Sequence, residues 1–193
     1  MQQLGSTDLK RLHRSWRRKG SFRLALLLEA VQSPFNLGSI VRTAAAMGAE
    51  ELFLVGETAV PNSPKAQRTA MGTDRYLRWR TYADVASAMP DIRAGGYRVV
   101  GLELADQAVP LASVDLAQDV CLAVGNEDRG LSTACLASCD VVAFAPQVGR
   151  VGSLNVTAAA AIGCYEVRRQ GWDAKDDREP PMLDDEASDA DLT

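Results

Sequence analysis

The chain has 193 residues, of which 47% are hydrophobic, and a formal net charge of −4, so it can form one globular domain with a substantial core. All apolar runs fall short of the roughly 20 residues that a membrane-spanning helix needs, which excludes that class. The four cysteines lie in apolar surroundings with no signal-like start and only one histidine, so we expect reduced thiols, no metal site and a cytoplasmic location.

The first element is a basic arm, which we place at residues 1–21. Residues 1–23 carry seven basic side chains against Asp8 alone, a net charge of +6. Arg14, Arg17 and Arg18 stand with Trp16 among helix-forming residues, a composition that suits binding along a polyanion such as RNA. A solvated amphipathic helix explains the same pattern, and the sequence leaves both interpretations open.

The middle of the chain, residues 22–170, alternates apolar runs of strand length with helical patterns. We expect strands at 22–29, 52–55, 97–102, 120–124 and 141–145, and helices at 36–47, 82–93, 131–138 and about 154–169. This alternation predicts an α/β fold, a mainly parallel sheet with helices on both faces. Ligands collect at the carboxyl ends of such strands, near Leu102, Gly125 and Ala145. The chain has neither a GxGxxG turn nor a GxxxxGK[ST] loop, which counts against ordinary NAD and ATP sites.

A basic and aromatic patch covers residues 65–80. Five cations are interleaved there with Tyr76 and Trp79, and such a mixture lets cations meet phosphates while aromatic faces stack on unpaired bases. Alternatively, the aromatic residues belong to a strand and the core, and the arginines alternate outward. We favour the core for Trp79 and RNA binding for Arg68 and Arg75.

Residues 148–166 form a pattern of a glycine-bearing loop followed by an alanine-rich helix of about four turns. Ser153 or Asn155 can cap this helix, because a side-chain oxygen there satisfies a backbone N–H that has no partner in the first turn. The alanines predict close packing against a neighbouring segment. An acidic tail, residues 171–193, ends the chain, and we expect it to be disordered because it has almost no large apolar residues.

Three stretches are more informative together than any one alone. They are Asn36-Leu-Gly-Ser-Ile-Val-Arg-Thr-Ala44, Gly125-Asn-Glu-Asp-Arg-Gly-Leu-Ser132, and the C-terminal stretch with Pro146 and Gly152-Ser-Leu-Asn155. Their order, spacing and residues resemble the three motifs of the SpoU/TrmH branch of the SPOUT RNA 2′-O-methyltransferases, over roughly residues 22–170. The resemblance implies methyl transfer from S-adenosyl-L-methionine to a ribose 2′-hydroxyl, in a homodimer with a deep C-terminal trefoil knot. Packing rules make knots rare, so the knot rests on the resemblance alone.

The resemblance also implies roles for individual residues. The cofactor contacts, largely through backbone groups, are at Leu102, Gly125, Ala145 and Leu154, although a larger aliphatic residue is usual at the position of Ala145. The catalytic group comprises Asn36, Arg42, Glu127, Ser153 and Asn155. Arg150 and Arg129 occupy the same loops and suit phosphate contacts. Glu127 can accept hydrogen bonds from Asn36, from Arg42 or from backbone amides, and a solvated loop carboxylate is the alternative.

Arg42 is our first candidate for catalysis, but not as a simple base. A guanidinium group stays charged in proteins, whereas a base works best with a pKa near the operating pH. We therefore expect Arg42 to grip an RNA phosphate and orient the 2′-hydroxyl, while that phosphate or a water takes the proton. We expect its side chain to share a side with Asn36 only if the loop before Leu37 turns inward. A surface arginine on an alanine-rich helix is the alternative.

The function that this combination favours is 2′-O-methylation of tRNA, with ribosomal RNA as the close competitor. The tRNA preference rests on the resemblance and on the short basic arm, which suits a compact substrate. An RNA-binding module with the same fold and no chemistry is the alternative from another class. The presence of Asn36, Arg42 and Glu127 counts against that module.

Overall fold

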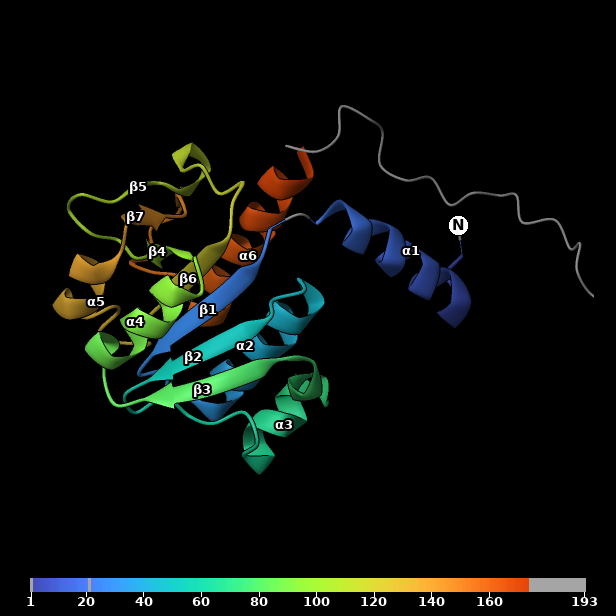
Figure 1. The fold of residues 1–193 in the computed structure, drawn as a ribbon, viewed down its shortest axis with the longest axis horizontal. Coiled ribbons are helices and arrows are strands. Elements are labelled where there is room, and N and C mark those ends of the chain that lie inside the picture. Colours follow the sequence, from blue (N-terminus) through green and yellow to red (C-terminus); the bar gives the residue numbers. More distant parts are fainter. Residues whose placement is uncertain (1, 21, 174–193) are drawn as a thin grey trace, which may run out of the picture.

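A computed structural model describes residues 2–20 and 22–173, which contain one seven-stranded parallel sheet flanked by helices (Figure 1). The strands are β1 (Leu24–Glu29), β2 (Glu51–Val55), β3 (Arg78–Tyr82), β4 (Arg98–Leu102), β5 (Val109–Pro110), β6 (Val120–Val124) and β7 (Val141–Phe144). Their order across the sheet is β3-β2-β1-β6-β4-β7-β5, and each pairing is parallel. The predicted α/β class with a parallel sheet is confirmed.

Five strands lie where the apolar runs predicted them. β3 corresponds to the alternative interpretation of residues 65–80, in which the aromatic residues belong to a strand, and β5 matches no predicted strand. β3 lies at the sheet edge, and its side chains, from Arg78 to Tyr82, are exposed or half-buried. An edge strand with exposed side chains carries charged residues, so it lacks the continuous apolar run by which a buried strand is identified. β5 has only two residues, too few for a periodic pattern.

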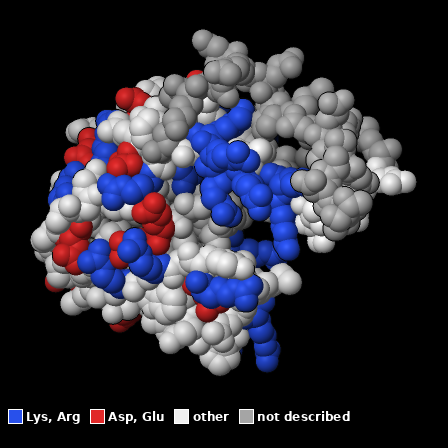
Figure 2. Space-filling model, turned by 45° about the vertical axis from the view of Figure 1, so that its right-hand side comes forward, with Lys and Arg blue, Asp and Glu red and all other residues white. Residues whose placement is uncertain are grey.

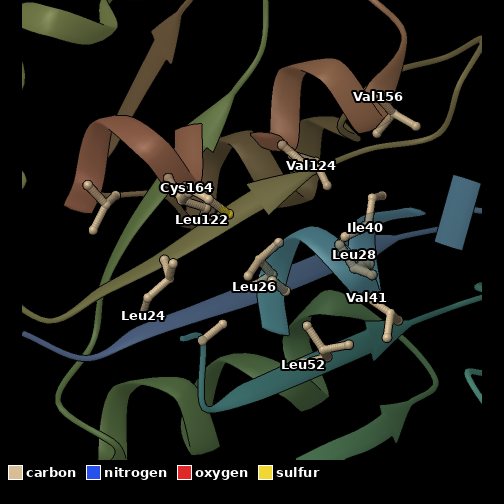
Figure 3. Packing of buried hydrophobic residues seen from close by; sticks show 14 of the residues in the cluster. Leu24, Leu26, Leu28, Ile40, Val41, Leu52, Leu122, Val124, Val156 and Cys164 are labelled. Carbon is tan, nitrogen blue, oxygen red and sulfur yellow. The ribbon is translucent and has the colours of Figure 1, made fainter. Parts of the chain in front are cut away.

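The helices divide between the two faces of the sheet, except the first, which buries none of its residues and lies apart from the sheet (Figure 1). They are α1 (Ser6–Lys19), α2 (Pro34–Ala46), α3 (Pro64–Ala70), α4 (Val85–Ala94), α5 (Thr133–Ser138) and α6 (Val156–Asp173), with 3₁₀ turns η1 (Thr73–Tyr76) and η2 (Leu111–Ser113). Successive residues of a strand point to opposite faces. Leu24, Leu26 and Leu28 of β1 pack with residues of α2 and α6 (Figure 3), whereas Ala25 and Leu27 pack with residues of α4 and α5. Both faces of β1 are therefore covered, as its apolar run predicted.

The helix α2 begins two residues earlier than predicted. Ser33 caps it, because the Ser33 Oγ accepts a hydrogen bond from the Asn36 N–H at 3.3 Å, and Pro34 occupies the first turn. Gly48 follows the helix with a φ of 66°, a conformation that favours glycine and ends the helix. Asn36 thus lies inside the first turn of α2.

The helix α6 starts at Val156, and Asn155 rather than Ser153 is its cap. The Asn155 Oδ1 accepts hydrogen bonds from the N–H of Thr157 at 2.8 Å and from its Oγ1 at 2.6 Å. Small residues let α6 approach the sheet closely. Ala160 is fully buried, and a Cβ added to Gly163 would come within 2.5 Å of the Leu102 side chain. These small residues therefore pack against the sheet.

The end of α6 corrects the predicted boundary of the acidic tail. The helix runs to Asp173, beyond its predicted end near residue 169, so residues 171–173 are helical. Gly171 is buried, and the Trp172 ring centroid lies 4.8 Å from that of Trp16 and 6.0 Å from that of Tyr165. This packing against α1 extends the helix, and composition alone did not reveal it. The rest of the predicted tail, residues 174–193, lies outside the described residues.

The structure can be examined for membrane-spanning helices, metal sites and the state of the cysteines. No helix within residues 2–20 and 22–173 is long and apolar enough to cross a bilayer. In that same part of the chain, His, Cys, Asp and Glu side chains form no group of three that could hold a metal ion. The four cysteines are free thiols, and burial raises the pKa of Cys164 to about 12.

Candidate functional site

A cavity of about 250 Å³ lies at the carboxyl ends of β4, β6 and β7. All four residues predicted to contact a cofactor line it, namely Leu102, Gly125, Ala145 and Leu154. They come together because β4 lies between β6 and β7, so that the segments after these three strands end side by side. The positions of the apolar runs in the sequence predict neither the order of the strands in the sheet nor this cavity.

The polar wall of the cavity is a tight loop, residues 126–130. The N–H of Asn126 donates to the carbonyl of Gly130 at 3.1 Å, and the N–H of Gly130 donates back to Asn126 at 2.9 Å. Gly130 has a φ of 67°, which favours glycine. A Cβ added to Gly125 would come within 2.2 Å of the Gly130 carbonyl carbon, so the backbone of the loop packs directly on Gly125.

Glu127 connects this loop to α2. The Asn36 Nδ2 donates to the Glu127 Oε1 at 2.8 Å, and the Ser33 N–H donates to the same oxygen at 3.3 Å. Burial acts to raise the pKa of Glu127, but the hydrogen bonds from Asn36 and from backbone amides outweigh it and leave the pKa below its ordinary value. Glu127 also lines the cavity. Of the hydrogen-bond donors predicted for Glu127, Asn36 and the backbone amides are the ones observed.

We expect Glu127→Gln to lower the free energy of unfolding at about pH 7, because the charged carboxylate stabilises the fold. A depressed pKa contributes stability above the ordinary value of 4.5, and that stability is lost as the pH falls through the lower, folded value. The difference in the free energy of unfolding between wild type and variant should therefore shrink below pH 4.5. Urea unfolding at a series of pH values measures it, with Asp128→Asn in the same loop as the control. A difference that does not change with pH would contradict this explanation.

Arg42 points away from the Asn36–Glu127 pair. Six residues along a helix turn the side chain by about 120° around the axis relative to its starting direction. We expected the two side chains to share a side only if the loop before Leu37 turned inward. Asn36 and Arg42 both lie within α2, so they do not share a side. The Arg42 Nη1 instead donates to the Sδ of Met71, just after α3, at 3.0 Å. Phe35, seven residues before Arg42 and thus on the same side of α2, is 58% exposed.

The residues of the C-terminal motif line the cavity or cap α6. Ser153 lines the cavity, whereas the side chain of Asn155 is engaged in capping α6. Arg150 is exposed in the loop before them, and Arg129 lines the cavity from the loop 126–130. A capping function and a position beside the cavity therefore occur together in this short stretch.

Basic side chains gather on the side of the molecule that carries α1. Figure 2, which turns this side forward, shows Lys and Arg in a nearly continuous band, with most of the visible Asp and Glu to its left. Arg14, Arg17 and Arg18 are exposed on α1, a helix that buries none of its residues. The arm is thus an amphipathic helix in contact with the domain through Trp16.

The basic and aromatic patch at residues 65–80 divides into exposed and packed residues. Arg68 and Arg75 are exposed, and the Arg75 guanidinium lies 4.8 Å from the centre of the exposed Tyr76 ring. Trp79 is half-buried and packs against the core, as favoured from the sequence. Arg80 forms ion pairs with two carboxylates at 2.8 and 2.7 Å, so it is less available to a phosphate.

Four polar residues of the cavity wall were not assigned a role from the sequence: Asn126 and Asp128, which belong to the second motif, and Glu103 and Gln147. Glu103 directly follows β4, and its Oε2 accepts a hydrogen bond from the Leu131 N–H at 2.8 Å, which fixes the end of the loop 126–130. Gln147 follows β7 and contributes a side-chain oxygen that is buried without a hydrogen-bond partner. Both lie within a few residues of a strand's carboxyl end, so the rule for ligand sites in parallel sheets could have included them.

The chain is similar to known proteins over most of its length. Residues 23–165 match the SpoU rRNA Methylase family. The 23S rRNA (guanosine-2′-O-)-methyltransferase RlmB of Acinetobacter baylyi is 33% identical over 148 residues, 76% of this chain and 60% of that protein. The tRNA (guanosine(18)-2′-O)-methyltransferase of Escherichia coli is 29% identical over 151 residues, 78% of this chain and 65% of that protein. Hence the chain spans less than two thirds of the length of these relatives.

A solved structure agrees with these relatives. The AdoMet-bound rRNA methyltransferase from Sinorhizobium meliloti superposes on this chain with a TM-score of 0.72 and 35% sequence identity. The superposition covers 76% of this chain and 56% of that one.

Proposed function

The chain belongs to the SpoU rRNA Methylase family, and on that premise we propose that it transfers a methyl group from S-adenosyl-L-methionine to a ribose 2′-hydroxyl of RNA. One observation carries the proposal. The loop that forms the polar wall of the cavity is bound through Glu127 to Asn36 at 2.8 Å. The cavity is therefore connected to the start of the helix that bears Arg42, which supports a methyl donor in the cavity and an RNA-binding group on the same helix.

The residues of the cavity suit this cofactor. Its apolar part, which includes Val124 and Phe144, can take a flat base, and we assign polar contacts to the backbone groups of Gly125, Ala145 and Leu154, which line the cavity. The carboxylates of its polar part complement the positive charge of the cofactor. When bound, S-adenosylmethionine supplies a methyl group on a sulfonium. The chain holds it in position and keeps water away.

In the mechanism that we propose, Arg42 grips a phosphate of the RNA and orients the 2′-hydroxyl. The guanidinium acts through charge and position, because it cannot accept a proton. Its contact with a thioether is weak compared with a charge-assisted bond, so a phosphate can replace Met71 at little cost. Asn36 and Glu127 hold the start of α2 against the cavity, and Ser153 and Asn155 position the hydroxyl region from the other loop. The phosphate or a water takes the proton.

The RNA would lie across the basic band. We assign the phosphate contacts to six exposed arginines, Arg14, Arg17, Arg18, Arg68, Arg75 and Arg150. Each neutralised phosphate releases counterions, so affinity should fall by about 10³-fold between roughly 50 and 200 mM salt if all six contacts form. Fluorescence anisotropy with labelled tRNA measures this slope. An affinity that stays flat with salt would contradict the assignment.

Three further features belong to the same proposal. We place a deep trefoil knot in the C-terminal part, supported by β6 lying between β1 and β4 while β7 lies beyond β4. We propose a homodimer, supported by Ile162 and Tyr165, which are 42% and 51% exposed on α6 beside Pro146 in an apolar depression. Light scattering on the purified protein tests the dimer. We also propose that the protein acts in the cytoplasm.

Transfer of radiolabelled methyl groups to separated tRNA and ribosomal RNA tests the function. We propose tRNA as the substrate and keep ribosomal RNA as the competitor, since relatives that act on each match this chain at similar identity. Label in either class that disappears with Arg42→Ala supports the enzyme, and mapping of the 2′-O-methyl sites identifies the nucleotide. Binding to RNA without transfer to either class would favour a non-catalytic module with the same fold.

A further inference from the structure

Gln147 presents an unusual polar group to the cavity. Its Oε1 is buried and has no hydrogen-bond partner, and no other buried side-chain nitrogen or oxygen in residues 2–20 and 22–173 is in this state. A buried acceptor without a partner is costly, and native proteins rarely keep one unless a ligand or water satisfies it. Gln147 also lines the cavity. The acceptor is therefore available to a donor of a ligand bound in the cavity.

The surroundings of Gln147 restrict what that donor can be. Gln147 follows Phe144 and Ala145, which line the cavity, and Leu154 lines it from the other end of the same loop. The carboxylates that suit a charged donor, at Glu103, Glu127 and Asp128, come from the other two loops of the cavity wall. The loop of Gln147 contributes the apolar lining residues Phe144, Ala145 and Leu154, which suit a neutral donor at the edge of a flat ring. S-adenosylmethionine offers one such group, the 6-amino group of its adenine.

We infer that the Gln147 amide recognises the adenine ring of the methyl donor, with its Oε1 accepting a hydrogen bond from the 6-amino group. A carboxamide is complementary to an adenine edge, because its oxygen accepts from the amine while its nitrogen can donate to an adjacent ring nitrogen. The inference rests on the proposed cofactor and adds to it a side chain that selects adenine over other bases. Gln147 is thereby a specificity residue, distinct from the backbone contacts at Gly125, Ala145 and Leu154.

Calorimetric binding of S-adenosylhomocysteine tests the inference without any catalytic step. Wild-type protein should bind it about 10 to 100 times more tightly than the analogue in which hydrogen replaces the 6-amino group. Gln147→Leu should weaken the binding of S-adenosylhomocysteine by a similar factor. The affinities of this variant for the two ligands should then lie within about threefold of each other. Gln67→Leu, an exposed glutamine on α3, should keep the wild-type discrimination.

The stability of the ligand-free protein separates recognition from a structural role. Because Gln147→Leu removes a buried acceptor that has no partner, the melting temperature without ligand should be unchanged or higher. A clear drop would mean that Gln147 supports the fold, and it would overturn the inference.

The remaining outcomes separate the inference from the proposed function. If wild type binds both ligands equally, the inference is wrong and the proposed function stands. If wild type instead binds a 2′-deoxy or 3′-deoxy analogue of S-adenosylhomocysteine more weakly and does not distinguish the analogue without the 6-amino group, the donor is a ribose hydroxyl. The assignment to adenine is then wrong. If wild type binds none of these ligands, the proposed function itself fails together with the inference.

Discussion

Replacing Arg42 by alanine should lower kcat/KM for methyl transfer by about 10²- to 10³-fold, because it removes the group that we propose to orient the reacting hydroxyl. The side chain is exposed and its Nη1 contacts only the flexible Met71 side chain among the described hydrogen bonds, so the fold should remain intact. Radiolabel transfer to the methylated RNA class at saturating cofactor measures the loss. Thermal unfolding of the variant verifies that its stability is unchanged.

Two further variants show how Arg42 acts. Arg42→Lys keeps the charge and loses the planar fork, so it should recover no more than about a tenth of the activity. Near-full activity would remove the bidentate grip from the mechanism. Arg68→Ala changes an exposed arginine on the neighbouring α3 and should raise KM for RNA while leaving kcat unchanged. If Arg42→Ala behaved in the same way, Arg42 would be a binding residue only.

Gly125→Ala should weaken the binding of S-adenosylhomocysteine by about 30-fold or more. The added Cβ would lie 2.2 Å from the carbonyl carbon of Gly130 and 2.4 Å from the nitrogen of Leu131. Both are backbone atoms, so the loop 126–130 must move as a whole and carry Glu127 away from Asn36. Calorimetry measures the affinity, and circular dichroism shows whether the sheet persists.

Gly152→Ala is the matched control for this substitution. A Cβ at Gly152 would meet nothing within 4 Å, although this glycine lies next to Ser153 in the wall of the same cavity. It should therefore bind S-adenosylhomocysteine almost as tightly as wild type. Equal losses in the two variants would mean that any change near the cavity disturbs it, and that close packing at Gly125 has no special importance.

The buried part of the fold could be predicted from the sequence. The apolar runs at β1, β2, β4 and β6 are continuous because both faces of these strands are covered, and such runs are recognisable without an alignment. β3 could not be found in this way, because its exposed arginines interrupt the pattern. The last residues of α6 were missed for a different reason. Their stability comes from the contact of Trp172 with Trp16, which is remote in the sequence.

The candidate site could be predicted only in part. The loops near Leu102, Gly125 and Ala145 were identified by a general rule about strand ends, and all three reach one cavity. The meeting of Asn36 with Glu127 depends on β1 and β6 being neighbours, a choice of strand order that local patterns do not specify. The direction of Arg42 depended on where α2 begins. Because α2 begins at Pro34, Asn36 lies inside its first helical turn, and the six-residue spacing then separates its side chain from that of Arg42.

The pairing of β1 with β6 has a consequence for how the chain is made. Leu24 pairs with Val120 and Leu28 with Val124, so a central pair of the sheet joins segments that leave the ribosome far apart in time. Until residue 124 has emerged, β1 keeps an open apolar edge, and an unpaired edge of this kind invites aggregation. Folding dominated by such distant pairings is slow. We therefore expect newly made chains to depend on protection by chaperones during translation, however stable the finished sheet is.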